Sequence, residues 1–154
     1  MTIRFLSCYP QLIPQRLARI YKVRNAFARF FLTAERKECF AFEIENVLFV
    51  PSQRPEDLPK WVSEFDVGII PFRKNKFTQN IYPMKINEYL SLGKAVVSTD
   101  FSDLDEFKSI CHIVQSKEEF SEALRKAIAT DSLSRKNERV AVAKLNSWRN
   151  RAKQ

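Results

Sequence analysis

The stretch NIYPMKINEYLSLGKAVVST, residues 80–99, decides the fold that we expect for this chain. A proline precedes a segment whose apolar residues recur one turn apart, and Gly93 stands just before the apolar run KAVVST. Proline favours the first helical position, and glycine favours the left-handed position that ends a helix. We therefore predict a helix over residues 83–92, with Pro83 in its first turn, and a buried strand over residues 94–99.

Apolar runs and amphipathic segments alternate on both sides of this stretch. We predict further strands over 3–8, 28–34, 46–51, 66–72 and 110–114, and helices over 14–27, 54–65 and 116–129. The run VGII has no polar interruption, which is typical of a strand covered on both faces in a parallel sheet. The chain is therefore predicted to be one α/β, Rossmann-like domain over residues 1–154, with a mainly parallel sheet and helices on both faces. Its last part, residues 131–154, is predicted to be a basic helix.

Composition favours a soluble globular protein. The chain has 154 residues, 45% hydrophobic and 29% charged, and no apolar run near the roughly 20 residues that cross a bilayer. Its start lacks the apolar core of a signal peptide, so we expect a cytoplasmic protein, at most attached to the inner face of a membrane. The three scattered cysteines are expected to be buried apolar residues, and the single histidine, His112, a strand residue, so no metal site is expected.

Positive charge is concentrated at the two ends of the chain. Residues 1–38 carry 8 basic and 2 acidic side chains, residues 39–134 carry 11 and 15, and residues 135–154 carry 7 and 1. Such ends suit an anionic membrane or nucleic acid, although solvated helix faces give the same pattern. The 13 phenylalanines lie mostly within apolar runs rather than beside Lys or Arg as stacking platforms do, so we expect no nucleic-acid partner.

The start of the helix predicted over 83–92 suits an anion. The backbone N–H groups of Met84, Lys85 and Ile86 are predicted to have no partner within the helix. A helix that begins after a parallel strand holds phosphates in many α/β domains. Lys85 adds a positive charge, and Arg73, Lys74 and Lys76 precede it in the loop.

Glu88 lies one turn further along the same helix. Helical side chains lean toward the helix N-terminus, so its carboxylate can reach a ligand at the helix start. A carboxylate accepts two hydrogen bonds from a ribose diol. The alternative is that Glu88 is an ordinary exposed residue of an amphipathic helix, since any such helix can carry one.

The segments NVLFV, LPKWVSEFDVGIIPF and YPMKINEYLSLGKAVVST together resemble the glycosyltransferase group 1 family, in the C-terminal domain of its GT-B fold. The resemblance covers roughly residues 25–150, and residues 1–24 match poorly. Members share the block P-x-K-x-x-E-Y-L-x-x-G-K-P-V-V. The matching residues here are Pro83, Lys85, Glu88, Tyr89, Leu90, Gly93, Lys94, Val96 and Val97, while Ala95 replaces a proline.

The resemblance implies a half-enzyme of hexosyltransferase type that binds an NDP-sugar of UDP or GDP type. Glu88 would hold the ribose, the amides near Tyr82, Met84 and Lys85 the diphosphate, and the loop from Ser52 to Arg54 would lie near the base. No cofactor or obligatory metal is implied. The acceptor would be bound by a separate N-terminal domain or chain. Some relatives glycosylate lipids or cell-envelope polymers.

The sequence also departs from the family pattern. Asn80 occupies the position where many relatives carry a second glutamate, and only 2 glycines, Gly68 and Gly93, are present where relatives have a Gly-rich turn. We therefore expect the isolated chain to be inactive, and no catalytic residue is assigned. A non-catalytic remnant of the fold and a basic nucleic-acid-binding module remain the alternatives. A phospho-receiver domain is excluded because DVGIIPF lacks an aspartate at its end.

Overall fold

The computed structural model describes residues 2–7, 27–33, 47–50 and 54–153, and within them a parallel sheet. Its strands are β1 (Thr2–Ser7), β2 (Phe27–Thr33), β3 (Val47–Val50), β4 (Val67–Ile70), β5 (Ala95–Thr99) and β6 (His112–Val114). Their order is β3-β2-β1-β4-β5-β6, and each neighbouring pair is parallel. This is the strand order of a doubly wound Rossmann-like domain, so the predicted fold class is confirmed.

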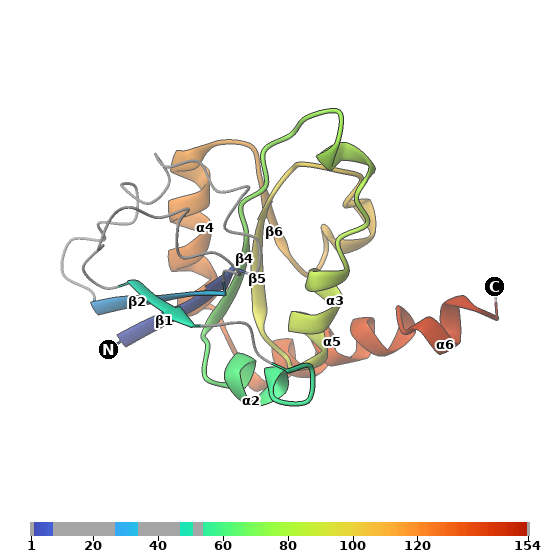
Figure 1. The fold of residues 1–154 in the computed structure, drawn as a ribbon, viewed down its shortest axis with the longest axis horizontal. Helices are drawn as coiled ribbons and strands as arrows, with labels where there is room; N and C mark the ends of the chain where they lie inside the picture. Colours follow the sequence, from blue (N-terminus) through green and yellow to red (C-terminus); the bar gives the residue numbers. More distant parts are fainter. Residues whose placement is uncertain (1, 8–26, 34–46, 51–53, 154) are drawn as a thin grey trace.

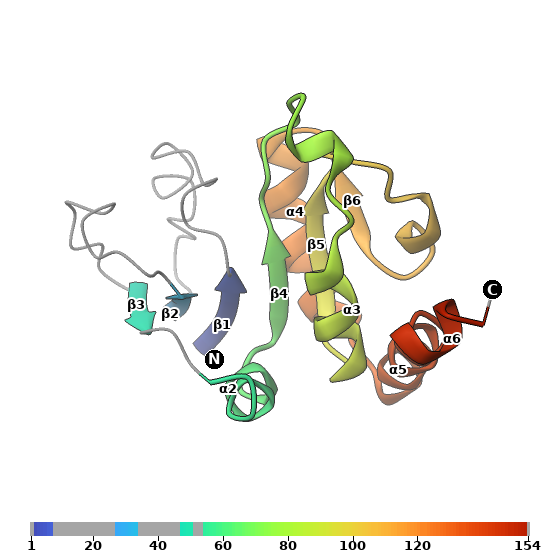
Figure 2. The ribbon, with the colours of Figure 1, turned by 45° about the vertical axis from the view of Figure 1, so that its right-hand side comes forward.

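Helices cover both faces of the sheet. They are α2 (Leu58–Ser63), α3 (Met84–Ser91), α4 (Lys117–Ala129), α5 (Leu133–Leu145) and α6 (Trp148–Arg151), with 3₁₀ turns η3 (Thr78–Asn80) and η4 (Asp105–Phe107). Helix α4 lies on one face of β4 and β5, and α3 lies on the other with α5 packed beyond it (Figures 1 and 2). The helix predicted over 14–27 falls outside the described residues except for Phe27, which begins strand β2.

Two apolar layers hold these helices to the central strands. Val67 and Val97 pack against the α4 side, where Phe120 and Leu124 are buried. Ile70 and Val96 face the α3 side, together with three buried residues of that helix, Ile86, Tyr89 and Leu90. Successive strand residues point to opposite faces, so an uninterrupted apolar run is required when both faces are covered. All four residues of β4 are buried accordingly.

Helix α3 ends as the sequence predicts. Gly93 has a φ of 70°, its N–H donates to the Leu90 carbonyl at 2.9 Å, and the Lys94 N–H donates to the Tyr89 carbonyl at 3.0 Å. These two bonds form a Schellman motif, in which glycine avoids the strain that a Cβ brings at positive φ. The start differs by one position, because Pro83 is the N-cap and the helix begins at Met84.

The closing basic segment was predicted as one helix, and this prediction is wrong. Asn146 ends α5, and Ser147 has extended backbone angles of φ −64° and ψ 147° before α6 begins. The helix predicted over 54–65 is shortened to α2, because Pro59 is tolerated only in a first turn. Figure 1 shows α5 and α6 extending away from the sheet and carrying the C-terminus.

Candidate functional site

The candidate site lies where α3 begins, at the edge of the sheet where the parallel strands end. The strand order reverses between β1 and β4, and residues 71–83 run from the end of β4 to the start of α3 (Figure 2). In doubly wound sheets, ligands bind outside the carboxyl ends of the strands at this reversal. The topology therefore puts α3 beside the expected binding crevice.

The loop before α3 has a defined hydrogen-bonded shape. The Asn75 side-chain oxygen accepts the N–H groups of Phe77 and Thr78, both at 2.9 Å. The buried Thr78 hydroxyl accepts the Asn75 N–H at 2.9 Å and donates to the Arg73 carbonyl. Thr99, at the end of β5, donates to the Phe72 carbonyl. These bonds fix the path of the chain into α3.

The backbone at the start of α3 is partly closed by its own chain. The Met84 N–H donates to the Tyr82 carbonyl at 2.9 Å, and the Ile86 N–H donates to the Pro83 carbonyl at 2.9 Å. The prediction that the first amides lack partners is therefore wrong for these two residues. The reason is that the chain tightens around Pro83, and short turns at helix ends satisfy amides that the helix itself leaves open. Because these two amides already have partners, the binding of an anion here would depend more on side chains, and less on backbone N–H groups, than the sequence predicts.

Glu88 and Lys85 form an exposed ion pair at this position. The Lys85 Nζ lies 2.6 Å from the Glu88 Oε2, and the two side chains are 25% and 46% exposed. The carboxylate leans toward the helix start, as helix geometry requires. An exposed pair one turn apart contributes little to stability, so both groups can exchange partners with a ligand at small cost.

The other residues predicted for the site are only partly brought together. Asn80 is exposed in η3, and its side-chain amide donates to the Lys76 carbonyl at 2.9 Å. Arg54 pairs with Asp57 at 3.0 Å just before α2, and Figure 2 shows α2 near the start of β4, away from the start of α3. No hydrogen bond or ion pair of the described residues joins Arg54 to Glu88. Ser52 lies outside the described residues.

A polar cluster around Tyr82 was not predicted. The Asn87 amide donates to the Tyr82 hydroxyl at 2.9 Å, and the Arg151 guanidinium lies 4.4 Å from the centre of the Tyr82 ring. Arg151 also donates to the Tyr82 hydroxyl and to both carboxylate oxygens of Glu106, at 3.1 and 2.9 Å. Burial raises the pKa of the Tyr82 hydroxyl, and Glu106 acts in the same direction. No local spacing signals this cluster, because its members are up to 69 residues apart.

Lys94 matches the family block but does not face the start of α3. Its Nζ donates to the Ser63 carbonyl at 2.7 Å, which ties the α3–β5 turn to the end of α2. Burial, followed by the charge of Lys136, lowers the pKa of the Lys94 ammonium. Its place in the structure indicates a packing role.

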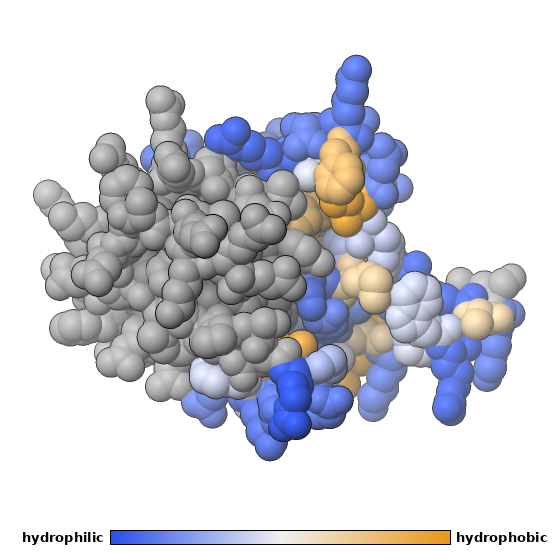
Figure 3. Space-filling view, in the orientation of Figure 1, coloured by the Kyte–Doolittle hydropathy of each residue, from blue (hydrophilic) through white to orange (hydrophobic). Residues whose placement is uncertain are grey.

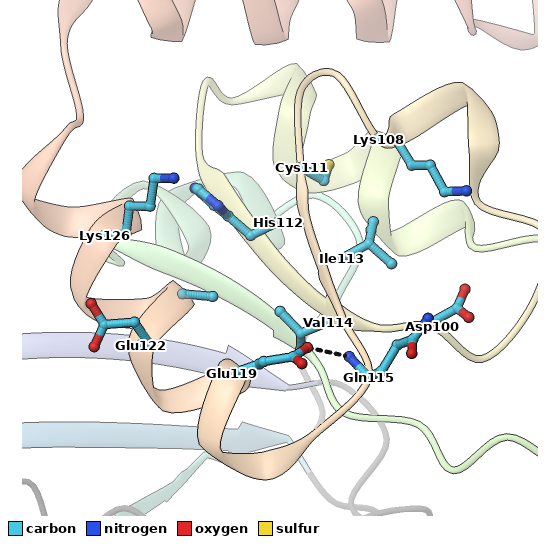
Figure 4. Close-up of a pocket in the computed structure, with 11 residues that line it drawn as sticks. Asp100, Lys108, Cys111, His112, Ile113, Val114, Gln115, Glu119, Glu122 and Lys126 are labelled. Atoms are coloured by element: carbon cyan, nitrogen blue, oxygen red, sulfur yellow. Dashed lines mark hydrogen bonds between the residues drawn. The ribbon is translucent and has the colours of Figure 1, made fainter.

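A hollow lies beside strand β6, between that strand and α4 (Figure 4). Burial and the nearby Lys126 lower the pKa of His112, and burial raises the pKa of the Cys111 thiol to about 12. The thiol is thus held in its unreactive form, as expected for a buried structural cysteine. His112 is a strand residue, as predicted. The described residues contain no group of three His, Cys, Asp or Glu side chains that could hold a metal.

The described surface is mainly hydrophilic on the face shown in Figure 3, with separate apolar side chains among the polar ones. The most exposed large apolar residues are Leu133, Phe77, Trp148 and Leu145, at 75%, 72%, 70% and 69%. None of the helices in the described ranges has the length and apolar character needed to cross a membrane.

Known proteins resemble this chain either in sequence or in three-dimensional structure. A glycosyltransferase of Bacillus subtilis (strain 168), TuaH, named for putative teichuronic acid biosynthesis, is 32% identical over 57 residues, which is 37% of this chain and 14% of TuaH. The E. coli trehalose-6-phosphate structure bound with UDP-2-fluoro glucose has a TM-score of 0.66 at 15% identity, over 96% of this chain and 41% of that chain. WaaG, a glycosyltransferase of lipopolysaccharide biosynthesis, has a TM-score of 0.61 at 17% identity, over 93% of this chain and 41% of WaaG.

These similarities agree on the fold and on its extent. At such low identity the structural matches establish a fold shared with part of each enzyme, and this chain spans about two fifths of their length. The family model described as glycosyl transferases group 1 matches residues 14–130, beginning earlier than the resemblance seen in the sequence. That match covers most of the chain, which therefore belongs to the glycosyl transferases group 1 family.

Proposed function

We propose that this chain is the nucleotide-sugar-binding half of a glycosyltransferase. The observation that carries the proposal is the exposed Glu88–Lys85 pair, which stands at the start of α3 beside the reversal of strand order. A carboxylate and an ammonium 2.6 Å apart match the two parts of a ribose diphosphate, a diol and an anion. Family membership supports the same ligand class.

In this proposal each side chain meets one part of the ligand. Glu88 accepts hydrogen bonds from the two ribose hydroxyls. Lys85 leaves Glu88 and pairs with the diphosphate, helped by the exposed cations Arg73 and Lys76 in the loop. The backbone near Tyr82 and Met84 lies at the same start of α3 and is assigned to the diphosphate.

The sugar and the base are assigned to neighbouring positions. We assign Asn80 to the sugar as a neutral hydrogen-bonding group, and Ser52 to the base. Arg54 is not assigned there, because it pairs with Asp57 just before α2. Leaving-group charge is stabilised by side chains and helix-end dipoles without an obligatory metal.

Transfer of the sugar also requires a site that binds the acceptor. In this proposal, that site is not part of this chain. The chain spans about two fifths of the related structures, and its resemblance to the C-terminal half of a GT-B fold implies a second, facing domain. We place the acceptor on a separate domain or chain, and we expect the isolated chain to bind the donor without transferring the sugar. TuaH supports a polymer of the cell envelope as the acceptor class.

Calorimetric titration with UDP, GDP and their sugars tests the proposal. We expect Glu88→Ala to weaken binding about tenfold or more, because two charge-assisted hydrogen bonds are lost. The matched control is Glu122→Ala on α4, since Glu122 forms the same kind of exposed pair, with Arg125 at 2.9 Å. Absence of binding to each of these nucleotides would instead favour a non-catalytic remnant of the fold.

We further propose that α5 and α6 rest on the inner face of an anionic membrane. Leu145 and Trp148 are 69% and 70% exposed, and the cations Lys144, Arg149 and Lys153 are exposed around them. Tryptophan and leucine beside lysine and arginine are typical of helices that lie at a lipid interface.

A further inference from the structure

We infer that Arg151, on the last helix of the chain, is a positioning residue for the nucleotide site at the start of α3. The inference rests on the proposed function and extends it to a helix far away in the sequence. Helix α5 packs along α3, and the short helix α6 follows α5 toward the C-terminus (Figure 2). Arg151 is thereby brought to Tyr82, 69 residues earlier.

Arg151 holds Tyr82 in two ways and is itself held by Glu106. Its guanidinium stacks over the Tyr82 ring at 4.4 Å, donates to the Tyr82 hydroxyl, and is itself fixed by Glu106 at 2.9 Å. Guanidinium is suited to this, because its planar fork can stack on a ring and donate several hydrogen bonds at once. Lysine has a single ammonium and cannot reproduce the arrangement.

Tyr82 in turn determines the first turn of α3. Its carbonyl accepts the Met84 N–H, and its hydroxyl accepts the Asn87 amide, so Tyr82 contacts the helix at two points one turn apart. Asn87 is the neighbour of Glu88. A shift of Tyr82 therefore moves both the backbone at the helix start and the turn that carries the proposed ribose ligand.

The cluster also contains buried polar atoms without partners. Among the described residues, the Asn87 Oδ1 and the Arg151 Nε are buried and make no hydrogen bond. Such atoms cost stability and are uncommon in folded proteins, so each calls for a reason beyond packing. A site that must hold Tyr82 in place supplies that reason.

The test compares three variants with the wild-type chain in titrations with UDP and GDP. Arg151→Ala removes the contact with Tyr82, Arg151→Lys keeps the charge without the planar fork, and Arg149→Ala is the control on the same helix. We expect Arg151→Ala to weaken binding about three- to tenfold. Arg151→Lys should recover part of this loss, and Arg149→Ala should bind as the wild type does.

Hydrogen exchange supplies a readout that a purely structural role does not change. In the wild type, nucleotide should slow exchange at the amides of α6, such as Arg151 and Ala152, which donate to Ser147 and Trp148 at 3.0 and 2.9 Å. Coupling between two sites is reciprocal, so this protection should be absent in Arg151→Ala.

The possible failures can be told apart. A wild-type chain that binds neither nucleotide overturns the proposed function, and this inference with it. A wild-type chain that binds, together with an Arg151→Ala variant of equal affinity and equal protection of α6, overturns only the inference. Equal losses in Arg151→Ala and Arg149→Ala also overturn it, because they reflect general electrostatics of the helix.

Discussion

Gly68 shows how one missing side chain positions a helix on this sheet. A Cβ at Gly68 would lie 2.4 to 2.9 Å from three atoms of the Tyr89 ring, which is closer than such atoms approach. Tyr89 is 1% exposed and belongs to α3, so its ring fills the space over β4 that glycine leaves open. The position of α3, and of Glu88 on it, therefore depends on a glycine in the neighbouring strand.

We predict that Gly68→Ala lowers the free energy of unfolding by about 1–3 kcal/mol, because overpacking forces the Tyr89 ring or the helix to move. Urea denaturation measures this change. The control is the same substitution in a Tyr89→Ala background, where the ring is gone and the added methyl group should cost far less. Equal costs in both backgrounds would contradict the proposed clash.

At the scale of elements, a buried arginine joins α5 to the end of α3. Arg139 is 3% exposed, and its guanidinium donates to the Gly93 carbonyl at 2.9 Å and to Asp131 at 2.7 Å. The first contact satisfies a carbonyl at the end of α3, and the second neutralises the buried charge. Helix α5 is thus held to the sheet through α3, which is the arrangement that lets α6 reach Tyr82.

We predict that Arg139→Ala destabilises the chain by about 2–3 kcal/mol, because a buried partner is removed from both a carbonyl and a carboxylate. This loss of stability is small for a buried ion pair, because Asp131 is 25% exposed and still has Lys136 as an ion-pair partner at 3.4 Å. Thermal unfolding followed by circular dichroism measures it. The exposed Arg135→Ala on the same helix is the control and should change little; a loss of similar size there would contradict a specific role for Arg139.

Across the whole molecule, basic side chains are concentrated near the C-terminus. The last 20 residues carry 7 of the basic side chains and a single acidic one. Helices α5 and α6 extend from the body of the domain (Figure 1), so the exposed cations in them or just after them, such as Lys144, Arg149 and Lys153, lie away from the sheet, while Arg139 is buried. This arrangement underlies the proposed contact with an anionic surface.

We predict that the chain co-floats with vesicles containing phosphatidylserine and not with pure phosphatidylcholine vesicles. Three cations near the surface, at about 1 kcal/mol each, give a preference of about a hundredfold that 0.5 M salt should remove. Trp148→Ala should weaken flotation, whereas Leu133→Ala, an exposed apolar residue at the other end of α5, should not. Equal flotation with both vesicle types would refute the membrane contact.

Features that depend on near neighbours could be predicted from the amino-acid sequence. Residue spacing predicted the central strands, α3 and α4, and the left-handed position of Gly93. Helix α4 begins close to the predicted residue 116, after the N-cap Ser116, whose hydroxyl accepts the Glu119 N–H at 3.1 Å. Residue spacing also predicted that Glu88 leans toward the start of α3. These follow from backbone geometry over one turn or one strand, and a short sequence window contains all the residues involved.

The composition of the candidate site could not be predicted in this way, because it depends on contacts between distant segments. The Tyr82–Arg151 contact, the Gly68–Tyr89 packing and the break before α6 have no local signal, because their partners meet only after the sheet and helices have assembled. The amides of Met84 and Ile86 have partners close in sequence, Tyr82 and Pro83, but the turn that joins them depends on how the loop enters α3. Contacts between distant segments are set by packing, and packing is a property of the whole chain.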